Sequence, residues 1–323
     1  MKNLIVSAFA FKEGLMTSIQ LNKPADSTTT EMYLKNLMVS LASAKTLNPD
    51  DDVCLCTNIE LPGEWDARFK KAGITVLKRE FDSFVLPDKF QWSLAFYKMC
   101  VLNGLVKEGG YDRYLLLDAD TYTTHDYKDL WSEADKGIVL YPLGHTYSHP
   151  DRDVIRRDFE RLCPEEAKVL PITHYGGEFV CGPKEALIRF MDVCLDLFAK
   201  ASGNNFDVEA TIGDESLWSI AAALLYKEIP VIPATPYIFR FWTVDFYLVS
   251  TVTVSNPVSI WHLPAEKDKG FIRMYNAYVK TGRFPDVDTA ARNFGIVKAK
   301  RPFNAITLSN KINGKIDSWK KKK

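Results

Sequence analysis

The residues best suited to chemistry are two aspartates that follow an apolar run. Residues 114–117 are all apolar or aromatic, and Asp118 and Asp120 come directly after them, separated by the small Ala119. On an extended strand, side chains two positions apart project to the same side, about 6 to 7 Å apart along the chain. This span suits a divalent cation with a bound water, because carboxylates are good ligands for Mg²⁺ and Mn²⁺. A cation held here would keep open positions for a diphosphate.

The elements that must position this pair alternate between strand and helix. Apolar runs and helical periodicity predict strands at 3–11, 52–57, 74–77 and 114–117 and helices at 31–45, 65–72 and 91–107. Such alternation favours parallel pairing in a sheet that helices cover on both faces. The aspartates would then end a fourth parallel strand, where sheets of this kind bind ligands. The alternative is an ordinary polar turn, since Asp-x-Asp is a frequent sequence.

The second half is predicted to continue the same domain. A strand at 137–141 and helices at 151–168, 186–200 and 214–226 follow, and no repeat or linker interrupts the chain. We therefore expect one α/β domain over residues 1–323, Rossmann-like, with a mostly parallel central sheet flanked by helices.

Composition and charge exclude several classes of protein. With 323 residues, 46% of them hydrophobic and 25% charged, the chain is neither disordered nor collagen-like. Its 41 basic side chains balance 41 acidic ones, so no overall field attracts nucleic acid. No stretch approaches the roughly 20 apolar residues of a membrane span, so we expect no transmembrane segment. The apolar residues 4–11 are better explained by a first core strand than by a signal peptide.

The cysteines show neither a zinc pattern nor a dense disulfide framework. The six of them are Cys54, Cys56, Cys100, Cys163, Cys181 and Cys194. We expect buried free thiols and a soluble protein in a reducing, cytoplasmic compartment. A metal or redox role for the Cys-x-Cys pair is the less favoured alternative.

Residues 97–98 and 114–121 together resemble the donor-site core of GT-A nucleotide-sugar glycosyltransferases, including the glycogenin-like group. In those enzymes an aspartate pair holds Mn²⁺ against the diphosphate of a sugar nucleotide. The resemblance implies a GT-A fold, Mn²⁺ (or Mg²⁺) as cofactor, a nucleoside-diphosphate sugar as donor, with UDP favoured, and a glycan hydroxyl as acceptor.

Three later segments extend the resemblance. Residues 175–182 and 213–216 are similar to glycine-rich and acidic segments of the ABO blood-group transferase family. Residues 260–262, with Lys267 and Lys269, resemble the late histidine–lysine segment of glycogenin-like enzymes. The segments occur in the expected order over roughly residues 3 to 270. Both resembled families retain the anomeric configuration, so retention is the expectation by analogy.

The resemblance and the strand ends together suggest roles for individual residues. Asp118, Asp120 and His262 would bind the metal, and an imidazole ligand favours Mn²⁺ over Mg²⁺. The predicted catalytic carboxylates are Glu215 first, then Asp214, which would also bind a sugar hydroxyl, and Glu178. The remaining residues predicted to bind the donor are Phe9 and Ala10 beside the base, Ala119 between the aspartates, Gly176 and Gly177 beside the sugar, and Lys98, Lys267 and Lys269 near the diphosphate.

Each of these residues also has a structural interpretation. His262 could be a core histidine, and the late lysines could lie in a solvated loop. Asp214 could cap the helix that follows it. The glycine pair could form a tight turn.

The division of the domain follows from the resemblance. Residues of about 1–120 would form the nucleotide-binding half, about 121–270 the donor-sugar and acceptor half, and about 271–323 a helical and basic extension. The polar and aromatic segments 145–149 and 239–242 suit an acceptor surface, although 239–242 could equally be core. The basic tail could make weak peripheral contact with an anionic membrane, or be a solvated terminus.

The sequence therefore predicts a metal-dependent glycosyltransferase. Two other enzyme classes use similar aspartates: phosphatases with an aspartate nucleophile, and nucleotidyltransferases. The first normally carries Asp-x-Asp on its first strand, and the second has a glycine-rich, arginine-bearing early loop that residues 7–18 lack. A nucleotide-sugar-binding protein without catalytic activity is the non-enzymatic alternative.

Overall fold

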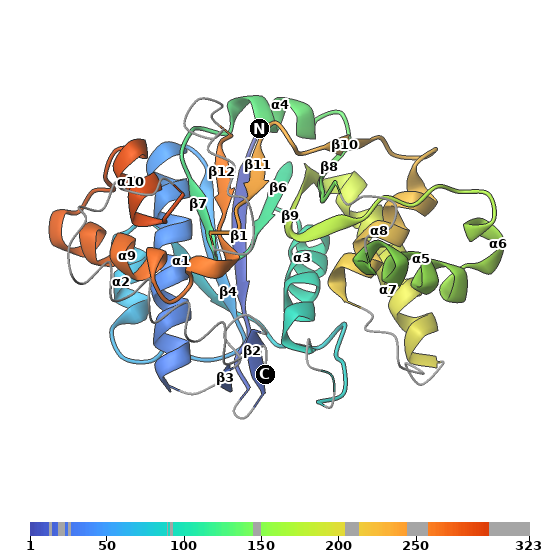
Figure 1. Ribbon diagram of the computed structural model, residues 1–323, viewed down its shortest axis with the longest axis horizontal. Coiled ribbons are helices and arrows are strands. Elements are labelled where there is room, and N and C mark those ends of the chain that lie inside the picture. Colours follow the sequence, from blue (N-terminus) through green and yellow to red (C-terminus); the bar gives the residue numbers. More distant parts are fainter. Residues whose placement is uncertain are drawn as a thin grey trace, which may run out of the picture.

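A computed structural model describes residues 1–12, 15–18, 23–24, 27–88, 90, 93–144, 150–203, 213–243 and 258–296 (Figure 1). Its centre is a seven-stranded sheet in the order β10–β8–β9–β6–β1–β4–β5. The strands are β1 (Asn3–Phe9), β4 (Asp52–Thr57), β5 (Thr75–Lys78), β6 (Arg113–Leu117), β8 (Ile138–Pro142), β9 (Tyr175–Pro183) and β10 (Val231–Pro233).

Pairing in this sheet is mostly parallel, as the sequence predicts. β4 and β6 both run parallel to β1, and β5 runs parallel to β4. Only β9 runs against its neighbours in this sheet, between β6 and β8. The prediction of an α/β architecture with a mostly parallel central sheet is confirmed.

Helices cover both faces of the sheet, as Figure 1 shows. One group consists of α1 (Ser27–Leu47), α2 (Trp65–Lys71), α9 (Gly270–Thr281) and α10 (Val287–Asn293). The opposite group consists of α3 (Tyr97–Glu108), α5 (Pro150–Leu162), α6 (Pro164–Ala167), α7 (Lys184–Gly203) and α8 (Asp214–Leu225). A further short helix, α4 (Lys128–Ala134), lies beyond one end of the strands.

The two helical layers explain the apolar run before the aspartates. Leu115 and Leu117 of β6 pack into one hydrophobic core, and Tyr114 and Leu116 pack into the core on the opposite face. Full burial of a leucine side chain is worth about 1.5 to 3 kcal/mol. Residues 114–117 of β6 lie between the two cores and are therefore apolar, whereas Asp118, the first residue beyond the strand, is free to be polar.

The chain changes direction across the sheet at β1. From β1 it moves through β4 and β5 toward one edge, and it then returns to place β6 on the other side of β1. The connections at the carboxyl ends of β1 and β6 therefore diverge and leave a crevice between them. Open α/β sheets bind ligands at such a switch point.

A smaller sheet brings the late part of the chain to this crevice. β7 (Thr121–Thr123) follows the aspartates and pairs antiparallel with β12 (Ile260–His262), which pairs in parallel with β11 (Ile238–Arg240). His262 lies opposite Thr121 in this register. Two further short strands, β2 (Met16–Ser18) and β3 (Lys23–Pro24), pair with each other.

Several predicted boundaries change. The helix predicted at 91–107 begins with a 3₁₀ turn, η1 (Ser93–Phe96), before α3. The helix predicted at 151–168 is divided into α5 and α6 at Cys163, because Pro164 cannot continue a helix but suits the first turn of a new one. The polar segment before residue 31 already contains the first turn of α1.

All six cysteines are buried free thiols, as predicted. Among the described residues, no helix is long and apolar enough to cross a membrane. Segment 145–149 and the tail after residue 296 lie outside the described residues.

Candidate active site

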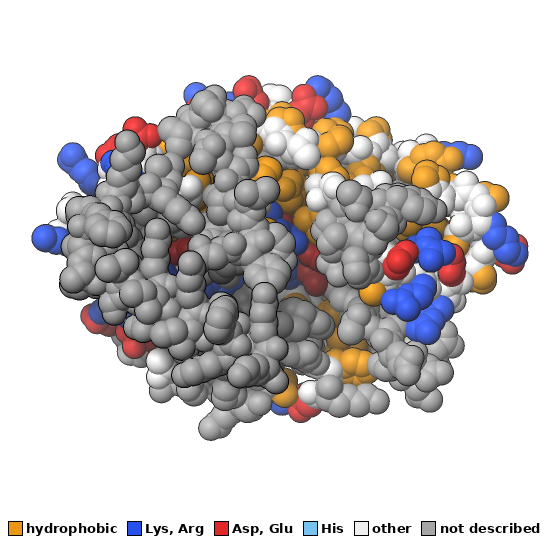
Figure 2. All heavy atoms as spheres, in the orientation of Figure 1, with side chains coloured by type: hydrophobic (Ala, Val, Ile, Leu, Met, Phe, Trp, Pro, Cys, Tyr) orange, Lys and Arg blue, Asp and Glu red, His pale blue; other side chains and the backbone are white. Residues whose placement is uncertain are grey.

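A cavity of about 440 Å³ lies at the carboxyl ends of β1 and β6. Figure 2 shows acidic and basic side chains side by side in the middle of the face that it presents. The predicted residues that line the cavity are Phe9, Ala10, Lys98, Asp118, Ala119, Asp120, Gly177, Glu178, Asp214, Glu215, His262 and Lys267. Two predicted residues are not part of the lining. Gly176 lies on β9, one residue before the lining residue Gly177, and Lys269 is exposed at the N-cap of α9.

The two aspartates lie in a turn, not on a strand. β6 ends at Leu117, and the Thr121 hydroxyl donates to the carbonyl of Asp118 at 2.9 Å. The prediction that both carboxylates project from one face of a strand is therefore wrong. The turn still brings them together, because one ligand atom each from Asp118, Asp120 and His262 lie within 4.8 Å of one another. Opposite ligands of a six-coordinate Mg²⁺-sized ion are about 4.2 Å apart, so small side-chain movements would complete a metal site.

The ring of His262 is oriented by a buried carboxylate. Its Nδ1 lies 3.0 Å from Oε1 of Glu178, and its Nε2 lies 3.4 Å from Oδ1 of Asp120. A proton on Nδ1 that is donated to Glu178 leaves the Nε2 lone pair facing the aspartates, as in carboxylate–histidine–metal arrangements. Burial lowers the pKa of His262, but Asp120 and Glu178 outweigh it and raise the pKa to about 9. A cation that binds Nε2 at neutral pH therefore has to displace a proton.

Each aspartate also pairs with a lysine whose side chain is largely buried. Lys98 lies 2.8 Å from Oδ1 of Asp118, and Lys267 donates to Oδ2 of Asp120. Burial alone would raise the pKa of Asp120, but Lys267 and His262 outweigh it and hold the pKa far below its usual range. Asp120 is thus ionised, with one oxygen engaged by a lysine and the other facing the histidine.

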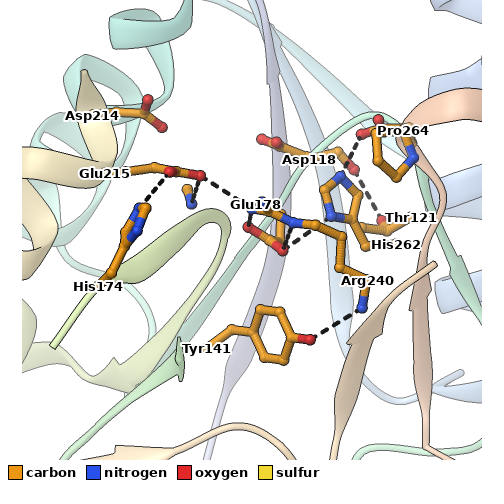
Figure 3. A network of polar contacts seen from close by, with 12 residues as sticks. Asp118, Thr121, Tyr141, His174, Glu178, Asp214, Glu215, Arg240, His262 and Pro264 are labelled. Atoms are coloured by element: carbon orange, nitrogen blue, oxygen red, sulfur yellow. Dashed lines mark hydrogen bonds and ion pairs between the residues drawn. The ribbon is translucent and has the colours of Figure 1, made fainter. Parts of the chain in front are cut away.

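A second charged group lies beside the first in the same cavity. Arg240 donates from Nε to Glu178 at 2.8 Å and from Nη2 to Glu215 at 3.0 Å, and His174 Nε2 lies 2.7 Å from Oε2 of Glu215. Figure 3 shows Glu178 between Glu215 on one side and His262 on the other. Burial opposes ionisation of both glutamates. The charges of Arg240 and His262 nevertheless keep the pKa of Glu178 well below normal. The hydrogen bond between His174 and Glu215, together with the charge of Arg240, lowers the pKa of Glu215 to about 2.

Asp214 and Glu215 begin helix α8 but differ in their environment. The N-cap of α8 is Gly213, so the interpretation of Asp214 as the capping residue is wrong. Its carboxylate instead lies 3.0 Å from the Lys98 ammonium. Burial raises the pKa of Asp214 in spite of that ammonium, whereas the pKa of Glu215 is lowered. The two neighbours therefore differ in basicity, as carboxylates with separate catalytic roles do.

The glycine pair leaves room for the site's own charges. A Cβ on Gly177 would lie 2.1 Å from Oδ2 of Asp214, and a Cβ on Gly176 would lie 2.1 Å from Oε2 of Glu178. Both spaces are filled by carboxylates of this chain. The structure thus gives a reason for the glycines that is different from the predicted contact with a sugar ring.

Replacing Gly177 by alanine should destabilise the protein by about 1 to 3 kcal/mol, the usual cost of overpacking a filled site. The added methyl group would displace Asp214, so ligand binding should weaken as well. Urea unfolding measures the loss of stability. Gly203→Ala is the matched control, because a Cβ there has no described atom within 4 Å and Gly203 lies in a helix. Equal stability of the two variants would contradict the crowding that the structure shows.

The structure also brings in residues that sequence reasoning missed. His174 contacts Glu215, and Arg240 contacts both Glu178 and Glu215. Tyr33 lines the cavity with its ring 5.9 Å from that of Phe9. Arg240 lies in the aromatic segment 239–242 that was predicted as acceptor surface, and Trp242 of that segment also lines the cavity. His174 has no neighbouring motif in the sequence that could have identified it.

The charges of the cavity favour a bound cation. Among the described lining residues, five carboxylates face three side chains that are always cationic, so two negative charges remain once a cation has displaced the proton from His262. One divalent cation would balance them.

Comparisons of the sequence with protein-family models and with curated proteins find no match. The geometry of the cavity therefore has to carry any proposal about activity.

Proposed function

We propose that this protein is a metal-dependent glycosyltransferase that uses a nucleoside-diphosphate sugar as donor and a glycan hydroxyl as acceptor. The observation that carries the proposal is the cluster of Asp118, Asp120 and His262 at the switch point between β1 and β6. Mixed carboxylate and imidazole ligands suit Mn²⁺, and nucleotides bind at such points of α/β sheets. A second set of carboxylates lies in the same cavity, where a donor sugar would follow the diphosphate.

The donor would lie along the cavity from base to sugar. The rings of Phe9 and Tyr33 offer an aromatic surface beside the end of β1, which suits a nucleobase such as uracil. Lys267 and Lys98 provide fixed positive charge where a leaving diphosphate accumulates negative charge. A bound Mn²⁺ would supply further charge stabilisation of that leaving group.

The carboxylates of Glu215, Asp214 and Glu178 suit different roles in the reaction. Glu215 is ionised, partly exposed and weakly basic, which suits stabilisation of positive charge at the anomeric carbon, or attack on it, better than proton abstraction. This property supports a retaining reaction. Asp214 is the more basic neighbour and is placed to bind a sugar hydroxyl. Glu178 is completely buried between Arg240 and His262, so we assign it a positioning role and not a catalytic one.

His174 should act by orienting Glu215. His174→Ala removes the 2.7 Å hydrogen bond, and we expect kcat to fall on the order of 10²-fold with little change in KM, because the donor keeps its other contacts. His174→Gln retains a donor group and should recover part of the loss. His125→Gln is the control, since His125 is exposed and is not part of the cavity lining. Equal loss in kcat for Ala and Gln would argue against the orienting hydrogen bond.

The proposal is tested by a thermal-unfolding screen of UDP-, GDP- and TDP-sugars, each with and without MnCl₂. A ligand at 100 times its Kd stabilises the native state by about 2.7 kcal/mol. We expect stabilisation by one donor class only when the metal is present. That donor should then release its nucleoside diphosphate slowly in the absence of acceptor.

The outcomes separate the proposal from its alternatives. Failure of every nucleoside diphosphate and sugar nucleotide to stabilise the protein with Mn²⁺ or Mg²⁺ would contradict the proposal. Release of pyrophosphate from a nucleoside triphosphate would indicate a nucleotidyltransferase, and release of phosphate from a phosphomonoester would indicate a phosphatase. Metal-dependent binding without any turnover would indicate a binding protein.

A further inference from the structure

The two lysines of the cavity hold the aspartates in different ways. An ammonium group can donate three hydrogen bonds. Lys98 uses all three, to Asp118 at 2.8 Å, to Asp214 at 3.0 Å and to the carbonyl of Gly177 at 2.9 Å. Lys267 donates to Asp120 and, at 3.4 Å, to the carbonyl of Pro264. Lys98 is therefore fixed by three acceptors, whereas Lys267 has one strong described partner.

Lys267 and a divalent cation compete for the same carboxylate. Both Lys267 and Asp120 are buried, with side chains 9% and 4% exposed, so solvent and salt screen their charges weakly. A bare cation at Asp120 would lie next to an ammonium group of the same sign. The ion pair with Lys267 thus opposes the binding of a metal ion alone.

A diphosphate in the cavity would weaken the opposition of Lys267 to metal binding. It carries several negative charges and acceptor oxygens, and Lys267 lines the cavity in which a diphosphate would lie against a metal at Asp120. Lys267 can exchange its single strong partner for phosphate oxygens. Lys98 cannot do so without also leaving Asp214 unpaired.

We propose that Lys267 makes the site selective for a divalent cation together with a diphosphate over the cation alone. This inference rests on the proposed function of the same site. Metal and nucleotide then bind with positive coupling, and by linkage each raises the affinity for the other by the same factor. The coupling arises from the ion pair between Lys267 and Asp120, because this ion pair opposes binding of the metal ion until a diphosphate offers Lys267 other acceptors.

Electron paramagnetic resonance of Mn²⁺ tests the inference by counting free ions in titrations with and without UDP. In the native protein we expect UDP to raise the affinity for Mn²⁺ at least about tenfold. Lys267→Met should bind Mn²⁺ alone about tenfold more tightly, and UDP should then add much less. Lys267→Arg keeps the charge and should retain weak binding of the bare ion. Lys269→Met, two residues away but exposed and outside the cavity lining, should behave like the native protein.

The results separate this inference from the proposed function. Mn²⁺ affinity that is unchanged or weaker in Lys267→Met, with circular dichroism showing a folded protein, would overturn the inference alone. Should Lys267→Met not fold, the native protein still decides, because equal Mn²⁺ affinity with and without UDP would also overturn it. A native protein that binds no Mn²⁺ even with UDP would overturn both the inference and the proposed function.

Discussion

Asp120→Asn should abolish most of the activity, with kcat/KM falling on the order of 10³-fold, or about 4 kcal/mol of transition-state stabilisation. The amide has nearly the shape of the carboxylate but lacks its charge, so it is a poor ligand for a hard cation. Mn²⁺ affinity should fall in parallel. The release of nucleoside diphosphate from the donor identified by the screen measures the activity, and paramagnetic resonance measures the metal.

A control variant and a test of folding show whether the loss of activity is specific to the Asp120 carboxylate. Asp129→Asn changes an exposed aspartate in the first turn of α4 and should leave both quantities unchanged. The amide introduced by Asp120→Asn would also leave Lys267 without its ionic partner, so thermal unfolding has to show that the variant is folded. Transfer that persists in folded Asp120→Asn would show that the cluster does not serve catalysis.

Arg240→Met should destabilise the protein by about 3 to 5 kcal/mol, the usual cost of removing one partner from a buried ion pair. Arg240 is the shared partner of Glu178 and Glu215, and the Glu178 side chain is completely buried. Without the guanidinium, Glu178 would be a buried charge that only His262 opposes. Urea unfolding at neutral pH measures the loss.

The chain offers a matched control for this variant. Arg189 pairs with Glu228 through two hydrogen bonds at 2.7 and 3.1 Å, but both side chains are about half exposed. Arg189→Met should therefore cost less than about 1 kcal/mol. The double variant Arg240→Met, Glu178→Gln should recover roughly 1 to 3 kcal/mol, because it removes the buried charge that the single change leaves. A similar cost for the two arginine changes would contradict the role of burial.

Local sequence patterns predicted the elements that carry the aspartates. The alternation of apolar runs and periodic helices was sufficient to place Asp118 and Asp120 at the end of β6, because that pattern depends on neighbours along the chain. The antiparallel insertion of β9 between β6 and β8 was not predictable in this way. It depends on pairing between strands that are distant in the sequence.

Local sequence patterns also fail to predict contacts of individual residues in the candidate site when the partners are distant in the sequence. His262 reaches the aspartates only because β12 pairs with β7, and it was identified by resemblance and not by pattern. Lys267 and Lys269 are two positions apart and look equivalent in the sequence, yet the first is buried in the cavity and the second is exposed. Arg240 and His174 were missed because their partners, Glu178 and Glu215, come from other elements. Contacts of this kind are decided by tertiary packing.

The central claim is that Asp118, Asp120 and His262 hold a divalent cation that in turn holds a diphosphate. Crystals soaked with MnCl₂ and UDP, measured at a wavelength where manganese scatters anomalously, test it most directly. We expect one strong anomalous peak roughly 2.0 to 2.4 Å from a carboxylate oxygen of each aspartate and from Nε2 of His262, with diphosphate oxygens completing its coordination. Bound UDP without a peak between these three side chains, or a peak elsewhere in the cavity, would contradict the claim.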